Sequence, residues 1–283
     1  MRIDAHQHFW DLDRLDYGWM PVGENILRRN YLPEDLQPIL EENRFDGCVV
    51  VQANTVMAEA WWLLELAEAN AFILGVVAWV DLIDPGLSGV LDELQTHPKF
   101  KGVRHLVHDE PDPRWLLRPD VLEGLRELTR RGIPYDLLLR PVHLPLVPEL
   151  AEKVPGLLMV IDHIAKPPIA SGRMDGWAED MRTAASVPGL CCKLSGMITE
   201  ADHANWKADD LRPYVQHVMS VFEPERLMFG SDWPVCKLAG SWKRTLAAFT
   251  QAIGAQPIEV REQILGETAK RFYGLKKLPA ESR

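Results

Sequence analysis

Residues 4–10 read DAHQHFW, and this first strand-like stretch carries two histidines that are one residue apart. In an extended strand, successive side chains point to opposite faces, so the alternation predicts that Asp4, His6 and His8 share one side. Two imidazoles on one face can bind a divalent cation or hold a water molecule. The stretch therefore predicts a functional face on the first strand, with two unconnected structural histidines as the alternative.

Eight strand-like runs alternate with helical patterns outward from this stretch, near residues 3, 49, 76, 103, 137, 160, 193 and 229. Helical patterns at 242–253 and 260–272 end the alternation. Over 283 residues this order predicts an α/β fold, a single (β/α)8 TIM barrel at 1–275 with a polar tail at 276–283. A doubly wound sheet is the alternative, but it commonly has fewer strands, and no Gly-x-Gly-x-x-Gly opens a helix here.

The overall composition excludes several classes of protein. A net charge of -10 argues against a general nucleic-acid binder, which needs a basic excess or stripe. No apolar run approaches the length of a membrane span, and the chain enters its first strand at once. We therefore expect a cytoplasmic protein with no membrane or nucleic-acid partner. Four cysteines without zinc-site spacing are expected to be reduced structural thiols.

In a barrel, the side chains that follow the strands meet at one mouth, where active sites of this fold lie. Titratable and polar groups are concentrated there. They are His6, His8, Gln52, Arg104, His105, Arg140, His143, Asp162, His163, Lys193, Ser195 and Asp232. Arg104 and Lys193 could instead form structural salt bridges. The long irregular segment at 11–30 is expected to cover this mouth.

Four motifs together resemble the amidohydrolase superfamily, in its amidohydrolase-2 branch. They are DAHQHFW at 4–10, DHIAKP at 162–167, KLSG at 193–196 and GSDWP at 230–234. Within that branch the chain is most similar to sugar-lactone hydrolases of the fucono- and rhamnono-lactonase type, and more distantly to pyrone-dicarboxylate lactonases. The resemblance implies a hydrolase of carbohydrate catabolism that opens an aldonolactone to the aldonic acid.

The resemblance also implies roles for individual residues. Asp232 would act as the general base that takes a proton from water and returns it to the leaving alkoxide. His163 would be the second catalytic residue, and His6 and His8 would surround the same water and the lactone carbonyl. We expect the pKa of Asp232 to be tuned toward neutrality in a partly dry mouth.

The resemblance leaves the metal open between one divalent ion, zinc or manganese, and none. If one ion is bound, its ligands would be His6, His8 and Asp232, and it would polarise the carbonyl. Without it, imidazole groups and Arg104 could stabilise the oxyanion. A two-metal site is not expected, because binuclear members carry a lysine at the end of the fourth strand, whereas Lys101 lies at its beginning.

The expected pocket mixes flat apolar faces with hydrogen-bond donors, a combination that suits a polyhydroxylated lactone ring. The residues expected to bind substrate are Trp10, Gln52, Arg104, His105, His143, Lys166 and Trp206. A dicarboxylate pyrone is a rival substrate, but only Arg104 and Arg140 could clamp it. Two rival functions are a metal-dependent decarboxylase of an aromatic or dienoic acid and a barrel without catalysis. The sequence is also compatible with a homo-oligomer.

Overall fold

The computed structural model describes residues 1–276 and contains one sheet of eight parallel strands whose spatial order follows the chain. The strands are β1 (Ile3–Gln7), β2 (Gly47–Val51), β3 (Ile73–Ala78), β4 (Phe100–His105), β5 (Tyr135–Leu137), β6 (Met159–Ile161), β7 (Cys191–Leu194) and β8 (Leu227–Phe229). A consecutive order of eight parallel strands is that of a (β/α)8 barrel, as the alternation predicted. The end of the predicted tail, at 277–283, lies outside the described residues.

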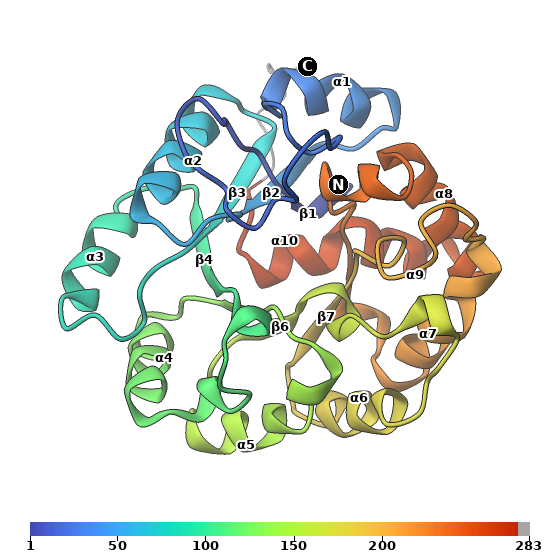
Figure 1. Ribbon diagram of the computed structural model, residues 1–283. Helices are drawn as coiled ribbons and strands as arrows, with labels where there is room; N and C mark the ends of the chain where they lie inside the picture. The colour runs from blue at the N-terminus through green and yellow to red at the C-terminus, as the bar shows by residue number, and fades with distance from the viewer. Residues whose placement is uncertain (277–283) are drawn as a thin grey trace.

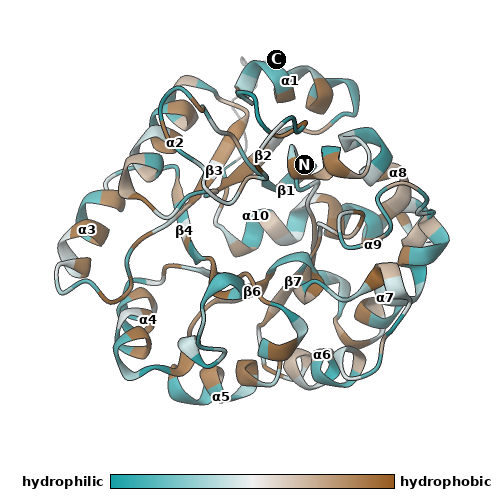
Figure 2. Cartoon of the chain, in the orientation of Figure 1, coloured by the Kyte–Doolittle hydropathy of each residue, from teal (hydrophilic) through white to brown (hydrophobic). Residues whose placement is uncertain are grey.

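A helix follows each strand, and Figure 1 shows α1 to α8 forming a ring around the sheet. These helices are α1 (Pro33–Glu42), α2 (Met57–Ala69), α3 (Leu87–Leu94), α4 (Pro119–Arg131), α5 (Leu146–Lys153), α6 (Trp177–Ala185), α7 (Ala208–Val221) and α8 (Trp242–Ile253). They carry both hydrophilic and hydrophobic residues, whereas β2 and β3 are mostly hydrophobic (Figure 2). Strands buried on both faces and amphipathic helices are what this architecture requires.

Hydrogen bonds between the first strand and the segment after the last one close the barrel. The backbone N–H of Asp232 donates to the carbonyl of His6 at 2.8 Å, and the N–H of His8 donates to the carbonyl of Trp233 at 2.7 Å. Gln7 and Trp233 form a parallel bridge at the same place. The start of the barrel and the segment after its last strand are therefore joined at residues of the first and last sequence motifs.

The buried side chains of the strands form two apolar clusters, as expected when one face of a barrel strand meets the helices and the other the interior. The smaller cluster includes Ile3, Ala5, Val49 and Met228, and it is completed by Tyr273. Tyr273 directly follows the short helix α10 (Thr268–Phe272), which comes after α9 (Ile258–Glu262) and a π-helical turn at Gln263–Glu267. The last helical segment therefore packs against the barrel interior.

The prediction that Asp4, His6 and His8 share one face of the first strand was wrong for Asp4. The pairing of β1 with β2 shifts between Asp4 and Gln7, where β1 spans three residues against two in β2. Such a bulge reverses the alternation. The carboxylate of Asp4 therefore accepts hydrogen bonds from the backbone N–H of Ser231 (2.8 Å) and from the indole N–H of Trp242 (2.7 Å), away from the two imidazoles.

Two expectations drawn from composition concern the cysteines, expected to be reduced thiols, and the absence of a membrane span. Cys48, Cys191, Cys192 and Cys236 are buried free thiols. Across residues 1–276, no helix combines the length and apolar character that crossing a bilayer requires.

Candidate active site

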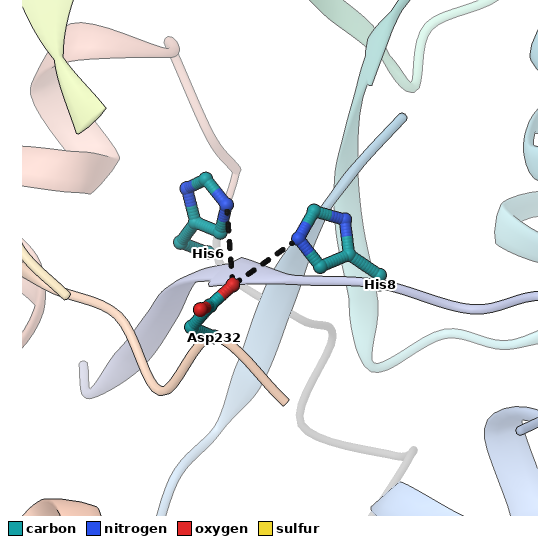
Figure 3. Close-up of side chains that lie close together, drawn as sticks. All are labelled: His6, His8 and Asp232. Atoms are coloured by element: carbon teal, nitrogen blue, oxygen red, sulfur yellow. Dashed lines mark ion pairs between the residues drawn. The ribbon is translucent and has the colours of Figure 1, made fainter. Parts of the chain in front are cut away.

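Three imidazole groups converge on one carboxylate at the C-terminal ends of the strands. Oδ1 of Asp232 lies 3.3 Å from Nε2 of His8 and 3.8 Å from Nε2 of both His6 and His163. Figure 3 shows the ring of His6, on β1, and the ring of His8, just after β1, approaching Asp232. All four side chains are almost completely buried. The predicted meeting of these residues at one mouth is thus what the fold produces.

Backbone conformation places two of these side chains. Asp232 has a left-handed φ of 57°, and it follows Ser231, whose N–H is held by the carboxylate of Asp4. After β6, four consecutive residues, His163 to Lys166, also have positive φ between 46° and 58°. A non-glycine residue rarely adopts this conformation, because its Cβ crowds the following carbonyl oxygen. Such strain is typical of functional sites.

The strained turn directs the His163 ring toward Asp232. Its Nδ1 is hydrogen-bonded to Oγ of Ser195 at 2.9 Å, and the backbone N–H of His163 donates to the same oxygen. Gly196 leaves room for the ring, since a Cβ at this position would lie 2.4 Å from Nδ1 of His163. The KLSG motif therefore positions His163 in two ways: the hydroxyl group of Ser195 binds the ring, and Gly196 leaves space for it.

The hydrogen bonds of His8 test whether a metal ion fits. Nδ1 of His8 lies 2.7 Å from the carbonyl oxygen of Val51, which can only accept, so Nδ1 carries the proton. In a neutral ring, the lone pair of Nε2 then faces Oδ1 of Asp232 at 3.3 Å, and two acceptors in contact require a cation between them. A proton or a metal ion can fill that role.

The donor set is one that zinc accepts. Nε2 of His6, Nε2 of His8 and a carboxylate oxygen of Asp232 are mutually close enough to share an ion. Ligand atoms of a tetrahedral zinc lie roughly 3.3 Å apart, close to the separations here. A second grouping, of His6, Asp162 and His163, adjoins the first. The residues present therefore fit one divalent ion.

Charges around the site set its protonation state. Burial lowers the pKa of His6 and of His163 well below the usual value, so both rings are neutral at pH 7. Burial alone would raise the pKa of Asp232, but His163 and the hydrogen bond from His8 outweigh it and hold this pKa below its usual value. Asp232 is therefore a carboxylate, and the expected shift toward neutrality was wrong.

Behind the imidazoles lies a buried ionic network. Nδ1 of His6 is 3.3 Å from Oδ1 of Asp162, which also pairs with Nζ of Lys193 at 3.0 Å. Arg104 donates to Oδ2 of Asp162 at 3.1 Å, and its other N–H groups donate to the side chain and carbonyl of Gln52. Arg104 and Lys193 thus do form salt bridges, as the structural alternative predicted, and these salt bridges adjoin the imidazoles of the site.

A cavity of about 150 Å³ opens above the imidazoles. It is lined by His8, Trp19, Ala53, Arg104, Leu106, His108, Asp109, Leu138, His163, Lys166, Asp232 and Val235. Of the seven residues expected to bind substrate, Arg104 and Lys166 belong to this lining. Nζ of Lys166 pairs with Glu200 at 3.1 Å. Trp19 lies in the segment 11–30, which was expected to cover the mouth.

The other five expected contacts lie outside this lining. The indole N–H of Trp10 donates to two carbonyls of the loop at 11–30, and that of Trp206 donates to Ala239. His105 stacks on Trp115 and pairs with Glu110 at 2.6 Å. Gln52 holds Arg104. His143 accepts a hydrogen bond from the backbone of Arg140. Of the five, Gln52 and Trp10 contact lining residues, Arg104 and Trp19.

Sequence reasoning missed Trp19 and His108 as parts of the cavity wall. Trp19 lies in an irregular loop, and the indole N–H donates to the carbonyl of Ala53 at 2.8 Å. His108 lies on the 3-10 turn Val107–Asp109 after β4. Its position three residues beyond His105 was a signal, since residues just past a barrel strand face the mouth.

Comparison with known proteins shows which family the chain matches. The profile of the amidohydrolase family matches residues 3–275. An L-fucono-1,5-lactonase from Burkholderia ambifaria is 39% identical over 241 residues, covering 84% of this chain and 82% of that protein. An L-fucono-1,5-lactonase from Burkholderia multivorans is 36% identical over 295 residues, covering 100% of this chain and 99% of that protein.

A solved structure extends the likeness to the whole barrel. The crystal structure of an amidohydrolase from Burkholderia multivorans with bound zinc superposes with a TM-score of 0.92 at 36% identity, covering 98% of this chain and 100% of that one. The family profile spans the barrel, and the histidines and aspartate of the four motifs meet at its mouth. The chain therefore belongs to the amidohydrolase family and is a hydrolytic enzyme, as its sequence motifs predicted.

Proposed function

We propose that this enzyme hydrolyses a sugar-derived lactone to the corresponding aldonic acid. The observation that carries the proposal is the convergence of three imidazoles on the ionised carboxylate of Asp232, at the base of a ring-sized cavity. The two relatives named L-fucono-1,5-lactonase support the same class of substrate. Lactone opening needs a base, a bound water and stabilisation of a developing oxyanion.

In the proposed reaction, Asp232 takes a proton from water as the water oxygen attacks the lactone carbonyl carbon. The tetrahedral species then collapses with cleavage of the bond between that carbon and the ring oxygen. Asp232 returns its proton to the ring oxygen, which leaves as a hydroxyl group. His163, fixed by Ser195, holds the water or the carbonyl oxygen during both steps. Water is the only other reactant, and the product is the ring-opened acid.

The fit of the donor set to one ion favours the metal-assisted form of the proposal. His6, His8 and Asp232 would hold one zinc or manganese ion, which would lower the pKa of the hydrolytic water toward ~7 and polarise the carbonyl. Asp162 lies 3.3 Å from the other nitrogen of His6, Nδ1, and its charge favours a proton there, which leaves Nε2 as the ligand atom. Such outer contacts commonly fix the tautomer of a ligating histidine.

The cavity favours a neutral substrate over a dicarboxylate. Arg104 lines it, but its N–H groups are already engaged by Gln52 and Asp162, so it contributes positive charge and no free donor fork. Arg140 points elsewhere, since it donates to the carbonyl of His108 and lies on the surface. A carboxylate clamp needs free, paired donors. A polyhydroxylated neutral ring matches the lining better.

A pH-indicator assay over a panel of aldono-1,4- and aldono-1,5-lactones tests the proposal. Chelator-treated protein is assayed with and without added zinc or manganese, and bound metal is measured by mass spectrometry. We expect acid release from one stereochemical series, at a higher rate with one bound ion per chain. Equal rates with and without metal would support the metal-free alternative. No hydrolysis under any condition would overturn the lactonase proposal and favour the decarboxylase.

A further inference from the structure

One nitrogen in the wall of the cavity has no hydrogen-bond partner. Among the side chains that the structure describes, Nδ1 of His108 is a buried atom without one, although the ring lines the cavity. The side chain of His108 is 16% exposed and lies on the turn that follows β4. Buried polar atoms are nearly always paired, so an orphaned one beside a binding cavity points to a missing ligand group.

The other ring nitrogen of His108 decides what that group must be. Nε2 lies 3.2 Å from a carboxylate oxygen of Asp109, and this negative charge favours the tautomer that carries its proton on Nε2. Burial, together with the charges of Lys166 and Arg104, lowers the pKa of His108 to about 3, so the ring is neutral. Nδ1 is then a hydrogen-bond acceptor. Its missing partner is a donor, such as a hydroxyl group.

The remaining walls limit where that donor can come from. Trp19 offers a flat ring, 40% exposed and anchored through its N–H to Ala53. Leu106, Leu138 and Val235 supply apolar contacts. A sugar ring has apolar faces and hydroxyl groups around its edge, so it can lie on an aromatic ring while one hydroxyl group reaches an acceptor beside it.

We propose that His108 determines substrate specificity, and that its Nδ1 accepts a hydrogen bond from one hydroxyl group of the lactone. The inference rests on the proposed lactonase function and adds to it a residue outside the four motifs. A substrate without that hydroxyl group forgoes the hydrogen bond and leaves Nδ1 unpaired, as it is in the free enzyme. Discrimination against such an analogue should be about tenfold to 100-fold in kcat/KM.

The test uses the aldonolactone that the enzyme hydrolyses fastest and its monodeoxy analogues, each lacking one hydroxyl group. We expect wild-type enzyme to lose about tenfold to 100-fold in kcat/KM on one analogue. His108→Phe keeps a ring but removes the acceptor, so it should hydrolyse the parent lactone about tenfold to 100-fold more slowly and no longer discriminate against that analogue. Its discrimination against the other analogues should be unchanged.

Further variants separate the possible failures. His108→Asn offers an amide oxygen near the position of Nδ1 and should restore discrimination, whereas His108→Leu removes the acceptor in a second shape if the Phe variant misfolds. His97→Phe, just before β4 at the opposite end of the barrel, is the matched control and should behave as wild type. Discrimination that survives in the Phe or Leu variant overturns the role of His108. A wild-type enzyme that opens no lactone overturns the proposed function as well.

Discussion

Asp232 combines burial with ionisation, and this combination depends on the histidines around it. His163 and His8 hold its pKa below the usual value although the carboxylate is buried. Asp232→Asn keeps the size of the side chain and removes the base. We expect kcat for lactone hydrolysis to fall at least ~100-fold, the usual scale for losing a general base.

The urea midpoint of Asp232→Asn should stay near that of wild type, and steady-state kinetics with urea unfolding measure both quantities. Asp209→Asn, at an exposed position in the first turn of α7, is the matched control and should leave kcat unchanged. Near-normal turnover in Asp232→Asn would contradict the assigned role.

At the scale of elements, the left-handed turn after β6 relies on the glycine that follows β7. A Cβ at Gly196 would meet the imidazole of His163, and Gly196 has a φ of 62°. Gly196→Ala should therefore displace the ring and lower kcat at least tenfold. It should also cost about 1–2 kcal/mol of stability from the left-handed backbone alone.

Gly172→Ala separates the two effects. Gly172 has a φ of 66°, but no atom would meet its Cβ, so this variant should lose similar stability and keep its kcat. Thermal unfolding and initial rates of both variants make the comparison. If the two variants lost activity equally, the contact between Gly196 and His163 would not be the cause.

The first turn of α2 contains a buried acid that couples stability to pH. Glu59 accepts hydrogen bonds from the backbone N–H groups of Ala53 and Asn54, and burial raises its pKa from 4.5 to about 7. Between these values the folded state binds the proton more tightly than the unfolded state, so the free energy of unfolding falls as pH rises. Glu59→Gln keeps an acceptor oxygen and removes this dependence.

Urea unfolding at pH 4 and pH 8 measures that dependence. The stability of Glu59→Gln relative to wild type should rise by about 3 kcal/mol between the two pH values, at 1.36 kcal/mol per pKa unit. Glu65→Gln, at an exposed position of the same helix, should show no such rise. Parallel pH dependence in wild type and Glu59→Gln would exclude Glu59 as its source.

At the scale of the whole molecule, a buried ionic network joins three strands to the end of the described chain. Nζ of Lys193 on β7 contacts Asp136 on β5 at 2.5 Å and Asp162 after β6 at 3.0 Å, and the hydroxyl group of Tyr273 donates to Asp136. Lys193→Met would leave the buried Asp136 without its cation and Asp162 with Arg104 alone. We expect a loss of about 3–5 kcal/mol in the free energy of unfolding.

Urea unfolding tests this network as well. Adding Asp136→Asn to Lys193→Met should recover part of the loss, because the unpaired charge is removed. The exposed pair of Lys243 with Glu42 provides the control, and Lys243→Met should cost at most about 1 kcal/mol. A loss of that small size in Lys193→Met would show that the network contributes little.

The sequence predicts most of the architecture, because alternation of strands and helices is a local property that eight repeats make unambiguous. The meeting of His6, His8, His163 and Asp232 then follows from topology alone. The position of Asp4 does not, since one extra residue in β1 reverses its face. Register irregularities of this kind depend on the partner strand and leave no pattern in the sequence.

Contacts made by loops were the other feature that could not be predicted from the sequence. The segment predicted as one helix at 260–272 is interrupted by a π-helical turn, where Gly266 approaches the carbonyl of Met1 so closely that a Cβ would lie 1.9 Å from it. Trp10 and Trp206 donate hydrogen bonds to loop carbonyls, and His108 and Trp19 line the cavity, so the substrate contacts predicted for Trp10 and Trp206 stay a prediction. Periodicity says nothing about where an irregular segment folds back.

The closure of the barrel has a consequence for protein synthesis. The hydrogen bonds that join β1 to the segment after β8 involve His6, His8 and Asp232 themselves. A nascent chain that ends before β8 therefore lacks the carboxylate and leaves one edge of β1 open, since β1 pairs with β2 on its other edge only. An open strand edge invites association with other chains. Premature termination should give inactive, aggregation-prone fragments instead of partly active ones. Enzyme activity should therefore appear only in chains whose synthesis has continued past residue 232.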